Sequence, residues 1–341
     1  MIKEAIISFI ISSGIVAVLI SLCHKYGFFT DKLDKDHAIH TKVTPKCGGI
    51  GIFISFFIVS YFYCRIGLDL VISSLPIFIF GVYEDSNGET PQSLRLLLMV
   101  ISSLIGVYLL KTYVTNIGFF ILPKIIGVIF TIFCVVGISS AINFIDGLNG
   151  LATGVCLLSV LFFGIIAYLF NDLIFLKLML ICFFAILGFF VFNYPFGKIF
   201  LGDGGAYFLG FLMAFISIIL VNRHPEISPW YPLNAFAYPI IETIVTIRRR
   251  YYKKKNKGIP FFQSEKVHLH TLLFKRKTRR NPVASAYLLS FHFLINLVAF
   301  LLKSNLPALI LLFILTWFIY LHWYKGMFIK ITKINSNGTT P

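Results

Sequence analysis

The chain has 341 residues, of which 58% are hydrophobic and only 13% are charged, and its mean hydropathy is +0.87. Soluble domains carry about 25% charged residues, so this composition excludes an ordinary soluble protein. The net charge of +16 is typical of cytoplasmic loops in a membrane protein, and we expect no nucleic-acid partner.

Apolar runs recur along the whole chain, and each is long enough to cross about 30 Å of hydrocarbon as a helix. The sequence lacks the alternating pattern of a membrane β-barrel. We therefore predict an all-α polytopic membrane protein with eleven transmembrane helices. The predicted spans are 3–23, 48–65, 66–83, 94–111, 124–142, 151–170, 177–193, 205–221, 233–247 with a kink at Pro239, 283–302 and 305–323.

The basic residues predict the orientation of these spans. With the N-terminus outside, the inner segments carry 23 of the 30 Lys and Arg residues, and 13 of these lie in 248–282. The excess of positive charge marks the cytoplasmic side, so the C-terminus is predicted to be cytoplasmic. We expect one catalytic membrane domain over 1–323, followed by a disordered cytoplasmic tail over 324–341.

Three polar stretches interrupt the apolar runs, and the predicted topology places all of them on the inner face. They are FGVYEDSNGETPQS (80–93), NFIDGLNGLA (143–152) and NYPFGKIFLGDGG (193–205). Their carboxylates Glu84, Asp85, Asp146 and Asp203 lie near span ends, where a carboxylate needs partners. Convergence on one divalent cation would supply them, and oxygen-only ligands favour magnesium or manganese. The alternative is four separate interfacial side chains in contact with water.

Glycines surround two of these carboxylates. Asp203 lies in FLGDGGAYFLG and Asp146 in DGLNGLATG, each directly before an apolar run. Such turns let backbone N–H groups approach an anion at a helix N-terminus. The two stretches together predict a metal and helix-end site for a phosphate or pyrophosphate.

The other two inner loops are rich in positive charge. The first contains HTKVTPKCGG, with Lys42 near a turn into the second span, and ordinary interfacial anchoring explains it equally well. The last contains RRRYYKKKNK, which we interpret as a solvated run with affinity for anionic lipid headgroups. His268 and His270 follow it and are plausible phosphate or acid–base groups, although a single HxH pattern is more often without function. The six cysteines show no metal-binding spacing and are expected to be small core residues.

Taken together, five motifs resemble those of the polyprenyl-phosphate N-acetylhexosamine-1-phosphate transferases, which are of the glycosyltransferase family 4 type. They are IHTKVTPKCGGIGI, GVYEDSNGETPQSLRL, NFIDGLNGLATG, NYPFGKIFLGDGGAYFLG, and PIIETIVTIRRR with VHLHTLLFKR. They occur in the family order and cover nearly the whole chain. The eleven spans and their orientation resemble the undecaprenyl-phosphate GlcNAc-1-phosphate transferase branch rather than the MurNAc-pentapeptide translocase.

The resemblance implies a reaction and its participants. A sugar-1-phosphate passes from a UDP-N-acetylhexosamine to undecaprenyl phosphate, with Mg²⁺ or Mn²⁺ as cofactor, and UMP is released. The lipid-diphosphate sugar would start a cell-envelope glycan such as O-antigen, capsule or a teichoic acid linkage. The reaction would take place at the cytoplasmic face of a bacterial inner membrane. The sugar and the formation of a homodimer stay open.

The resemblance also implies roles for individual residues. Asp203 and Asp146 would bind the metal. Asp146 and Asn143 would also shape the nucleotide site. Glu84 and Asp85 would orient or deprotonate the lipid phosphate. The remaining candidates are substrate contacts: Lys42 with a phosphate, Phe200 stacked on uracil, Asn193 and Asn149 near the nucleotide, and His268 and His270 at the sugar diphosphate.

Four positions depart from the family pattern. Glu84 and Asn149 stand where the family usually has Asp, Thr271 where a further His is common, and Glu242 where span nine usually carries Asp. The missing His argues against the translocase. A catalytically degenerate member is one alternative, and a polytopic secondary transporter is another. The transporter is disfavoured because the acidic residues gather at one face and the span centres are nearly free of charge, whereas a transporter should carry charged groups near the bilayer midplane.

Overall fold

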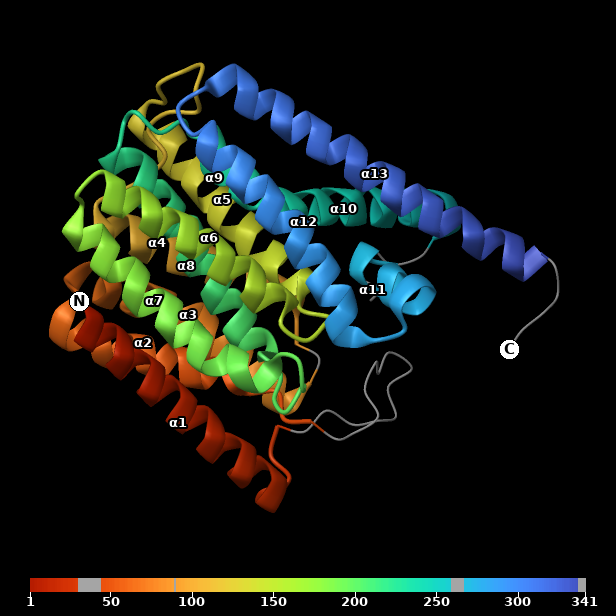
Figure 1. The fold of residues 1–341 in the computed structure, drawn as a ribbon, viewed down its shortest axis with the longest axis horizontal. Helices are drawn as coiled ribbons and strands as arrows, with labels where there is room; N and C mark the ends of the chain where they lie inside the picture. The colour runs from red at the N-terminus through yellow and green to blue at the C-terminus, as the bar shows by residue number, and fades with distance from the viewer. Residues whose placement is uncertain (30–43, 89, 259–266, 337–341) are drawn as a thin grey trace.

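The computed structural model describes residues 1–29, 44–88, 90–258 and 267–336, and Figure 1 shows their arrangement. These residues form α-helices and one short π-helical turn, with no strand among them. The elements are α1 (Ile2–Tyr26), α2 (Gly48–Tyr63), α3 (Arg65–Asn87), α4 (Gln92–Leu110), α5 (Lys124–Ile145), α6 (Leu151–Leu169), α7 (Leu173–Asn193), α8 (Gly202–Arg223), α9 (Trp230–Ala235), α10 (Ala237–Lys257), α11 (Leu269–Leu273), η1 (Phe274–Thr278), α12 (Asn281–Leu301) and α13 (Leu306–Ser336).

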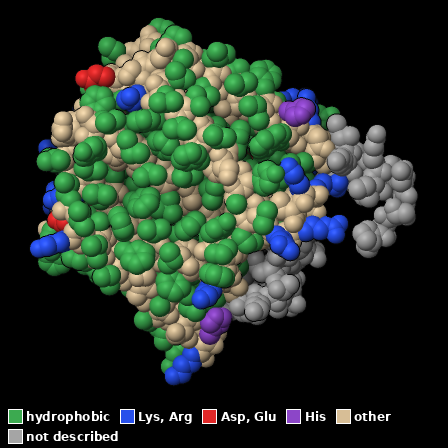
Figure 2. Space-filling view, in the orientation of Figure 1, with side chains coloured by type: hydrophobic (Ala, Val, Ile, Leu, Met, Phe, Trp, Pro, Cys, Tyr) green, Lys and Arg blue, Asp and Glu red, His purple; other side chains and the backbone are tan. Residues whose placement is uncertain are grey.

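The helices confirm the predicted all-α membrane architecture. Within the described residues, nine helices are long and apolar enough to span a bilayer, and α2 is a shorter apolar helix of 16 residues. Hydrophobic side chains cover most of the face seen in Figure 2, as expected for a surface in contact with lipid. The count of eleven spans and their orientation stay predictions.

Predicted span nine differs from the structure, because it is broken at Phe236 into α9 and α10. Pro239 favours this break, since it lacks an N–H and its ring would clash with the carbonyl four residues earlier, which is that of Ala235. The Ala235 carbonyl instead accepts hydrogen bonds from Ser159 Oγ at 3.2 Å and Asn296 Nδ2 at 3.4 Å. The expected kink is therefore a complete break, and side chains of α6 and α12 bind the freed carbonyl.

Helix α13 is longer than the last predicted span. It continues through Ser336, so the described part of the predicted tail, 324–336, is helical. Residues 337–341 lie outside the described residues.

Helix α8 forms the centre of the bundle and packs against α2, α3, α5 and α6. Nearly all of its side chains between Gly204 and Leu220 are buried. Helices α1 and α13 lie on opposite sides of the bundle (Figure 1). Close approach to α2 depends on Gly205, because a Cβ there would lie 2.7 Å from the Gly49 Cα. The N-terminus of α8 is thereby held among the ends of its neighbours.

Candidate active site

The candidate site lies where six helix ends meet. Helices α3, α5 and α7 end in the polar stretches, α6 and α8 begin in them, and α2 begins directly after the first inner loop. Because successive membrane helices run in opposite directions, these ends share one end of the bundle. The packing of α8 against α2, α3, α5 and α6 brings them together in space.

Asp85 is bound to the beginning of α8. Its Oδ1 accepts a hydrogen bond from the Asp203 N–H at 2.9 Å, and its Oδ2 accepts one from the Gly204 N–H at 3.1 Å. Asp85 is buried, with 9% of its surface exposed. Both of its oxygens therefore serve as caps for N–H groups that have no partner within the helix. A carboxylate of the protein therefore lies at this helix N-terminus, and a phosphate there stays a prediction.

Gly202 permits this contact. Its φ is +79°, a conformation that favours glycine. A Cβ at this position would lie 2.6 Å from Asp85 Oδ2 and 2.6 Å from the Lys46 carbonyl oxygen. The glycine is thus required both by the backbone conformation and by the close approach of the α3 and α2 ends.

Asp203 lies among the other predicted carboxylates. Its Oδ1 accepts a hydrogen bond of 2.6 Å from Asn143 Nδ2 on α5. It is near enough to interact electrostatically with Glu84, Asp85 and Asp146. The structure therefore brings four carboxylates together that are up to 119 positions apart in the chain.

Asp146 lies directly after α5 and receives no hydrogen bond at its carboxylate from the described residues. Burial, together with the negative charge of Asp203, raises the pKa of Asp146 to about 7. The negative charges of the two carboxylates repel each other, which disfavours ionisation of both. A cation bound between them would offset this repulsion.

The donors fit a magnesium ion that is bound mainly by substrate. No group of three or more His, Cys, Asp or Glu side chains within the described ranges is placed to hold a metal ion by itself. Magnesium is commonly held by one or two carboxylates, with water and substrate phosphates as its other ligands. Asp203 and Asp146 supply such a pair, and Asn143 fixes one oxygen of Asp203.

Glu84 belongs to a separate network at the same end of the bundle. Its Oε1 accepts a hydrogen bond from Thr90 Oγ1 at 2.8 Å, and its Oε2 accepts one from the Tyr207 hydroxyl at 3.2 Å. Arg95 donates a hydrogen bond of 3.0 Å to the same hydroxyl. Glu84 therefore connects α3 to α8 beside Asp203.

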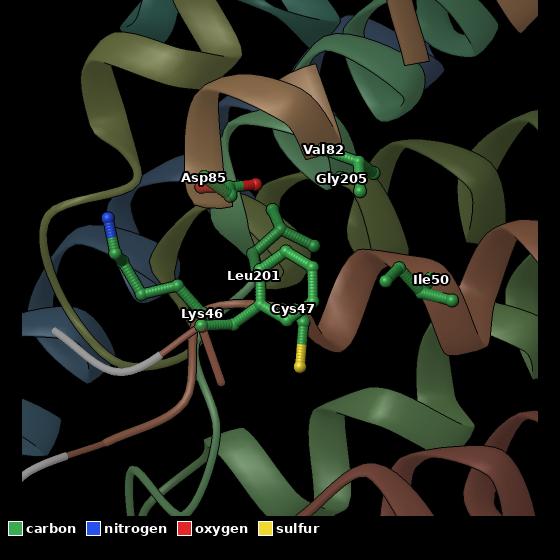
Figure 3. Close-up of a pocket in the computed structure, with 8 residues that line it drawn as sticks. Lys46, Cys47, Ile50, Val82, Asp85, Leu201 and Gly205 are labelled. Carbon is green, nitrogen blue, oxygen red and sulfur yellow. The ribbon is translucent and has the colours of Figure 1, made fainter. Parts of the chain in front are cut away.

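The first inner loop pairs with the segment before α8. The Phe200 N–H donates to the Pro45 carbonyl, and the N–H groups of Gly48 and Gly49 donate to the carbonyls of Phe200 and Leu201, all at 2.8–2.9 Å. This pairing builds a narrow crevice, shown in Figure 3. It is lined by Phe29, Lys46, Cys47, Ile50, Val82, Asp85, Leu201 and Gly205. Phe200 is half-buried, and Lys42 lies outside the described residues.

Asn193 and Asn149 connect the loops of the site to each other. Asn193 is buried, accepts a 2.5 Å hydrogen bond from the Gly150 N–H and donates one of 2.7 Å to the Ile199 carbonyl. Asn149 Nδ2 donates to the Pro195 carbonyl at 3.3 Å. Both side chains therefore hold the loop before α6 against the loop after α7.

The two predicted histidines lie beside the Asn143–Asp146 stretch. Their rings are stacked, with centroids 5.3 Å apart, and the His268 ring also stacks on Phe144 at 6.2 Å. His270 packs against Gly147, where a Cβ would lie 2.5 Å from Nε2. Burial and the neighbouring His268 lower the pKa of His270 to about 3, so His270 is neutral.

Comparison with known proteins gives consistent matches. The family model described as glycosyl transferase family 4 matches residues 68–221. A probable undecaprenyl-phosphate N-acetylglucosaminyl 1-phosphate transferase of Bacillus subtilis is 26% identical over 321 residues, which cover 91% of this chain and 88% of that protein. The resemblance to glycosyl transferase family 4 is confirmed.

Two further relatives represent both branches of the family. An undecaprenyl-phosphate alpha-N-acetylglucosaminyl 1-phosphate transferase of Thermotoga maritima is 28% identical over 86% of this chain and 87% of its own length. A phospho-N-acetylmuramoyl-pentapeptide-transferase of Streptococcus agalactiae is 34% identical, but over 59% of this chain and 60% of its own length. The two transferases named for N-acetylglucosamine match most of the chain, in agreement with the predicted branch, and a phospho-N-acetylmuramoyl-pentapeptide-transferase of Streptococcus pneumoniae matches 82% of it at 28% identity.

The segment that matches glycosyl transferase family 4 contains most of the predicted site, but neither histidine. Outside it, the structure adds Glu242, which binds His268. Within it, the structure adds Tyr207 and Arg95, which bind Glu84 or each other. A carboxylate in an apolar span is a signal for Glu242. Tyr207 and Arg95 carry no such signal, because tyrosine and arginine are common at membrane interfaces.

Proposed function

We propose that this protein transfers an N-acetylhexosamine-1-phosphate from a UDP-sugar to undecaprenyl phosphate. A phosphate oxygen of the lipid attacks the β-phosphorus of the UDP-sugar, the bond to the α-phosphate oxygen breaks, and UMP leaves. The product is a lipid-diphosphate sugar that begins a cell-envelope glycan. One observation carries the proposal: Asp203 is fixed at the beginning of α8 by Asp85 and Asn143, beside Asp146.

The proposed roles depend on which carboxylate oxygens receive no hydrogen bond from the described residues. Asp203 and Asp146 would hold Mg²⁺, which when bound offsets negative charge on the diphosphate. Asn143 fixes Asp203 Oδ1, so the side chain has one defined orientation. Asp85 acts on Asp203 through the α8 backbone and holds the metal-binding carboxylate in place.

The acceptor phosphate would approach from the first inner loop. Lys46 lines the same crevice as Asp85 and offers a positive charge there (Figure 3). The neighbouring Ile50, Val82 and Leu201 give the crevice an apolar wall. Because the crevice has no room for a water molecule in this structure, the acceptor phosphate would meet Lys46 at its rim, where its negative charge needs a cation.

The donor sugar diphosphate would lie beside residues 143–146 and the two histidines that pack against them. Phe144 joins these two groups, because it follows Asn143 in the chain and stacks on His268. We place this site at the cytoplasmic face of a bacterial plasma membrane, since the basic segments of the chain cluster on the same predicted side.

Reconstitution tests the proposal directly. Purified protein in nanodiscs receives undecaprenyl phosphate, Mg²⁺ and, one at a time, radiolabelled UDP-N-acetylhexosamines. Lipid-extractable label and UMP are expected in equal amounts with at least one donor, and neither without the metal. Undecaprenol, which lacks the phosphate, serves as the matched acceptor and should give no product. Absence of lipid product with every donor and with both Mg²⁺ and Mn²⁺ would contradict the proposal.

A further inference from the structure

Glu242 is a buried carboxylate to which the proposed reaction assigns no role. It lies on α10 and none of its surface is exposed. Burial of a carboxylate is costly unless several donors satisfy it. The described residues provide three donors, and each of them lies in the C-terminal half of the chain.

The three donors connect α10, α11 and α13. His268 Nδ1 lies 2.9 Å from Glu242 Oε1. The Leu269 N–H donates to Oε2 at 3.1 Å, and the Tyr320 hydroxyl donates to the same oxygen at 2.8 Å. A simple structural brace would need only the backbone and tyrosine contacts. The third contact uses a histidine that already belongs to the proposed site.

The contact determines which nitrogen of His268 carries a proton. An ionised carboxylate only accepts hydrogen bonds, so the Nδ1 that faces it is protonated. The other ring nitrogen, Nε2, is then the one left to engage a substrate. A carboxylate that orients an imidazole in this way acts on the chemistry through the ring.

Packing holds the ring of His268 in a fixed plane. It stacks on His270, with an interplanar angle of 7°, and on Phe144, with an angle of 27°. Phe144 follows Asn143, which binds Asp203, and His270 contacts Gly147, which follows Asp146. The ring is thereby fixed against the segment that carries Asp146 and the Asn143 that binds Asp203.

We propose that Glu242 is a positioning residue that holds His268 with Nδ1 protonated and Nε2 directed to the donor sugar diphosphate. The role of His268 rests on the proposed transferase function, whereas the protonation of Nδ1 does not. His270 differs from His268, because its Nδ1 has no hydrogen-bond partner among the described residues. Only one of the two stacked rings is therefore oriented by a carboxylate.

A double-mutant cycle tests whether Glu242 acts through His268. We compare Glu242→Gln, His268→Ala and the double variant, with Tyr320→Phe as the matched control that removes another donor from the same carboxylate. Glu242→Gln is expected to lower kcat about 10–100-fold, by analogy with the carboxylate partners of metal-bound histidines, with little change in the KM for the UDP-sugar. In the His268→Ala background the same substitution should change kcat by less than about twofold. If Glu242 acts only through His268, the effects of the two substitutions on kcat do not add. The kcat of Tyr320→Phe should stay within about threefold of the wild-type value.

Two outcomes of the cycle would overturn the proposal. One is an unchanged kcat in Glu242→Gln. The other is an additive loss in the double variant, which would mean that Glu242 stabilises the fold independently of His268. Thermal unfolding of each variant in detergent identifies a variant that fails to fold, and Tyr320→Phe then shows whether loss of a brace alone reduces kcat.

A spectroscopic measurement separates this inference from the proposed function. Proteoliposomes containing ¹⁵N-labelled histidine are examined by solid-state NMR, and the His268 signals are assigned by their loss in His268→Ala. The wild type should show a protonated Nδ1 at His268, and Glu242→Gln should change that signal. An unprotonated Nδ1 in the wild type would refute the positioning role even if the enzyme transfers phosphosugar. A protonated Nδ1 in a protein without transferase activity would refute the function and leave the Glu242–His268 pair established.

Discussion

Replacement of Asp85 by Asn tests whether this residue acts as a helix cap or as a base. An asparagine keeps one acceptor oxygen but places an NH₂ donor against one of the two backbone N–H groups of α8. Loss of a hydrogen bond to a charged group costs about 1.5–3 kcal/mol. Loss of the favourable charge at a helix N-terminus adds up to about 2 kcal/mol when the site is partly buried.

Together these two contributions amount to about 3 kcal/mol, near the middle of their ranges. This is the free energy by which Asp85→Asn should destabilise the held position of the beginning of α8. Since about 1.4 kcal/mol corresponds to a factor of ten, the equilibrium between the held and the displaced beginning of α8 shifts about 100-fold. Because Asp203 is the second residue of α8, we expect transfer activity to fall by a similar factor. A displacement of about 1 Å at a catalytic group is sufficient for such a loss.

Two measurements on Asp85→Asn decide between the two roles. Thermal unfolding in detergent reports the loss of the cap, and UMP release in nanodiscs reports activity. Asp69→Asn is the matched control, because Asp69 is near the other end of α3 and pairs with the exposed Arg65, a type of ion pair worth about 0–1 kcal/mol. An Asp85→Asn protein with unchanged thermal stability and no activity would refute the cap and favour a base. A protein with unchanged activity would refute both roles.

Three other perturbations have defined outcomes. Asp203→Asn should abolish Mg²⁺-dependent UMP release, and EDTA should do the same reversibly in the wild type; retained release in either case would refute the metal assignment. Gly202→Ala should lower thermal stability and activity together, since a positive φ costs a non-glycine residue about 1–2 kcal/mol before the contact with Asp85 is counted. Asn193→Ala removes the side chain that binds the Gly150 N–H and the Ile199 carbonyl. With two unsatisfied buried groups, we expect the free energy of unfolding to fall by about 2–4 kcal/mol. An Asn193→Ala protein of normal stability and weaker UDP-sugar binding would instead support the predicted nucleotide contact.

The architecture and the position of the site could be predicted from the sequence, because both depend on one-dimensional patterns. Apolar runs of the length of a bilayer predict membrane helices. Alternation of successive helices then assigns each polar stretch to one end of the bundle. This reasoning places Asp85, Asp146 and Asp203 together, and the structure brings Asp85 and Asp146 within electrostatic range of Asp203.

The partners of individual side chains could not be predicted, because they depend on close contacts between distant segments. Nothing in the sequence around Asp85 indicates that it binds N–H groups 118 and 119 positions later. The break at Phe236 is similar. A proline inside a helix predicts a kink near Pro239, but not that Ser159 and Asn296, from distant parts of the chain, bind the released Ala235 carbonyl.

The structure changes how losses of activity at this site must be interpreted. Asp85, Asn143, Asn149 and Asn193 use polar atoms to bind the protein itself, although the family resemblance implies substrate-facing roles for all four. Removal of any of them is therefore expected to displace loops or the beginning of α8, whatever its contact with substrate. Activity alone cannot assign a role to such residues, because a displaced α8 and a missing ligand both stop transfer. Thermal stability, measured beside activity in the same variant, separates the side chains that build the site from those that face the diphosphate.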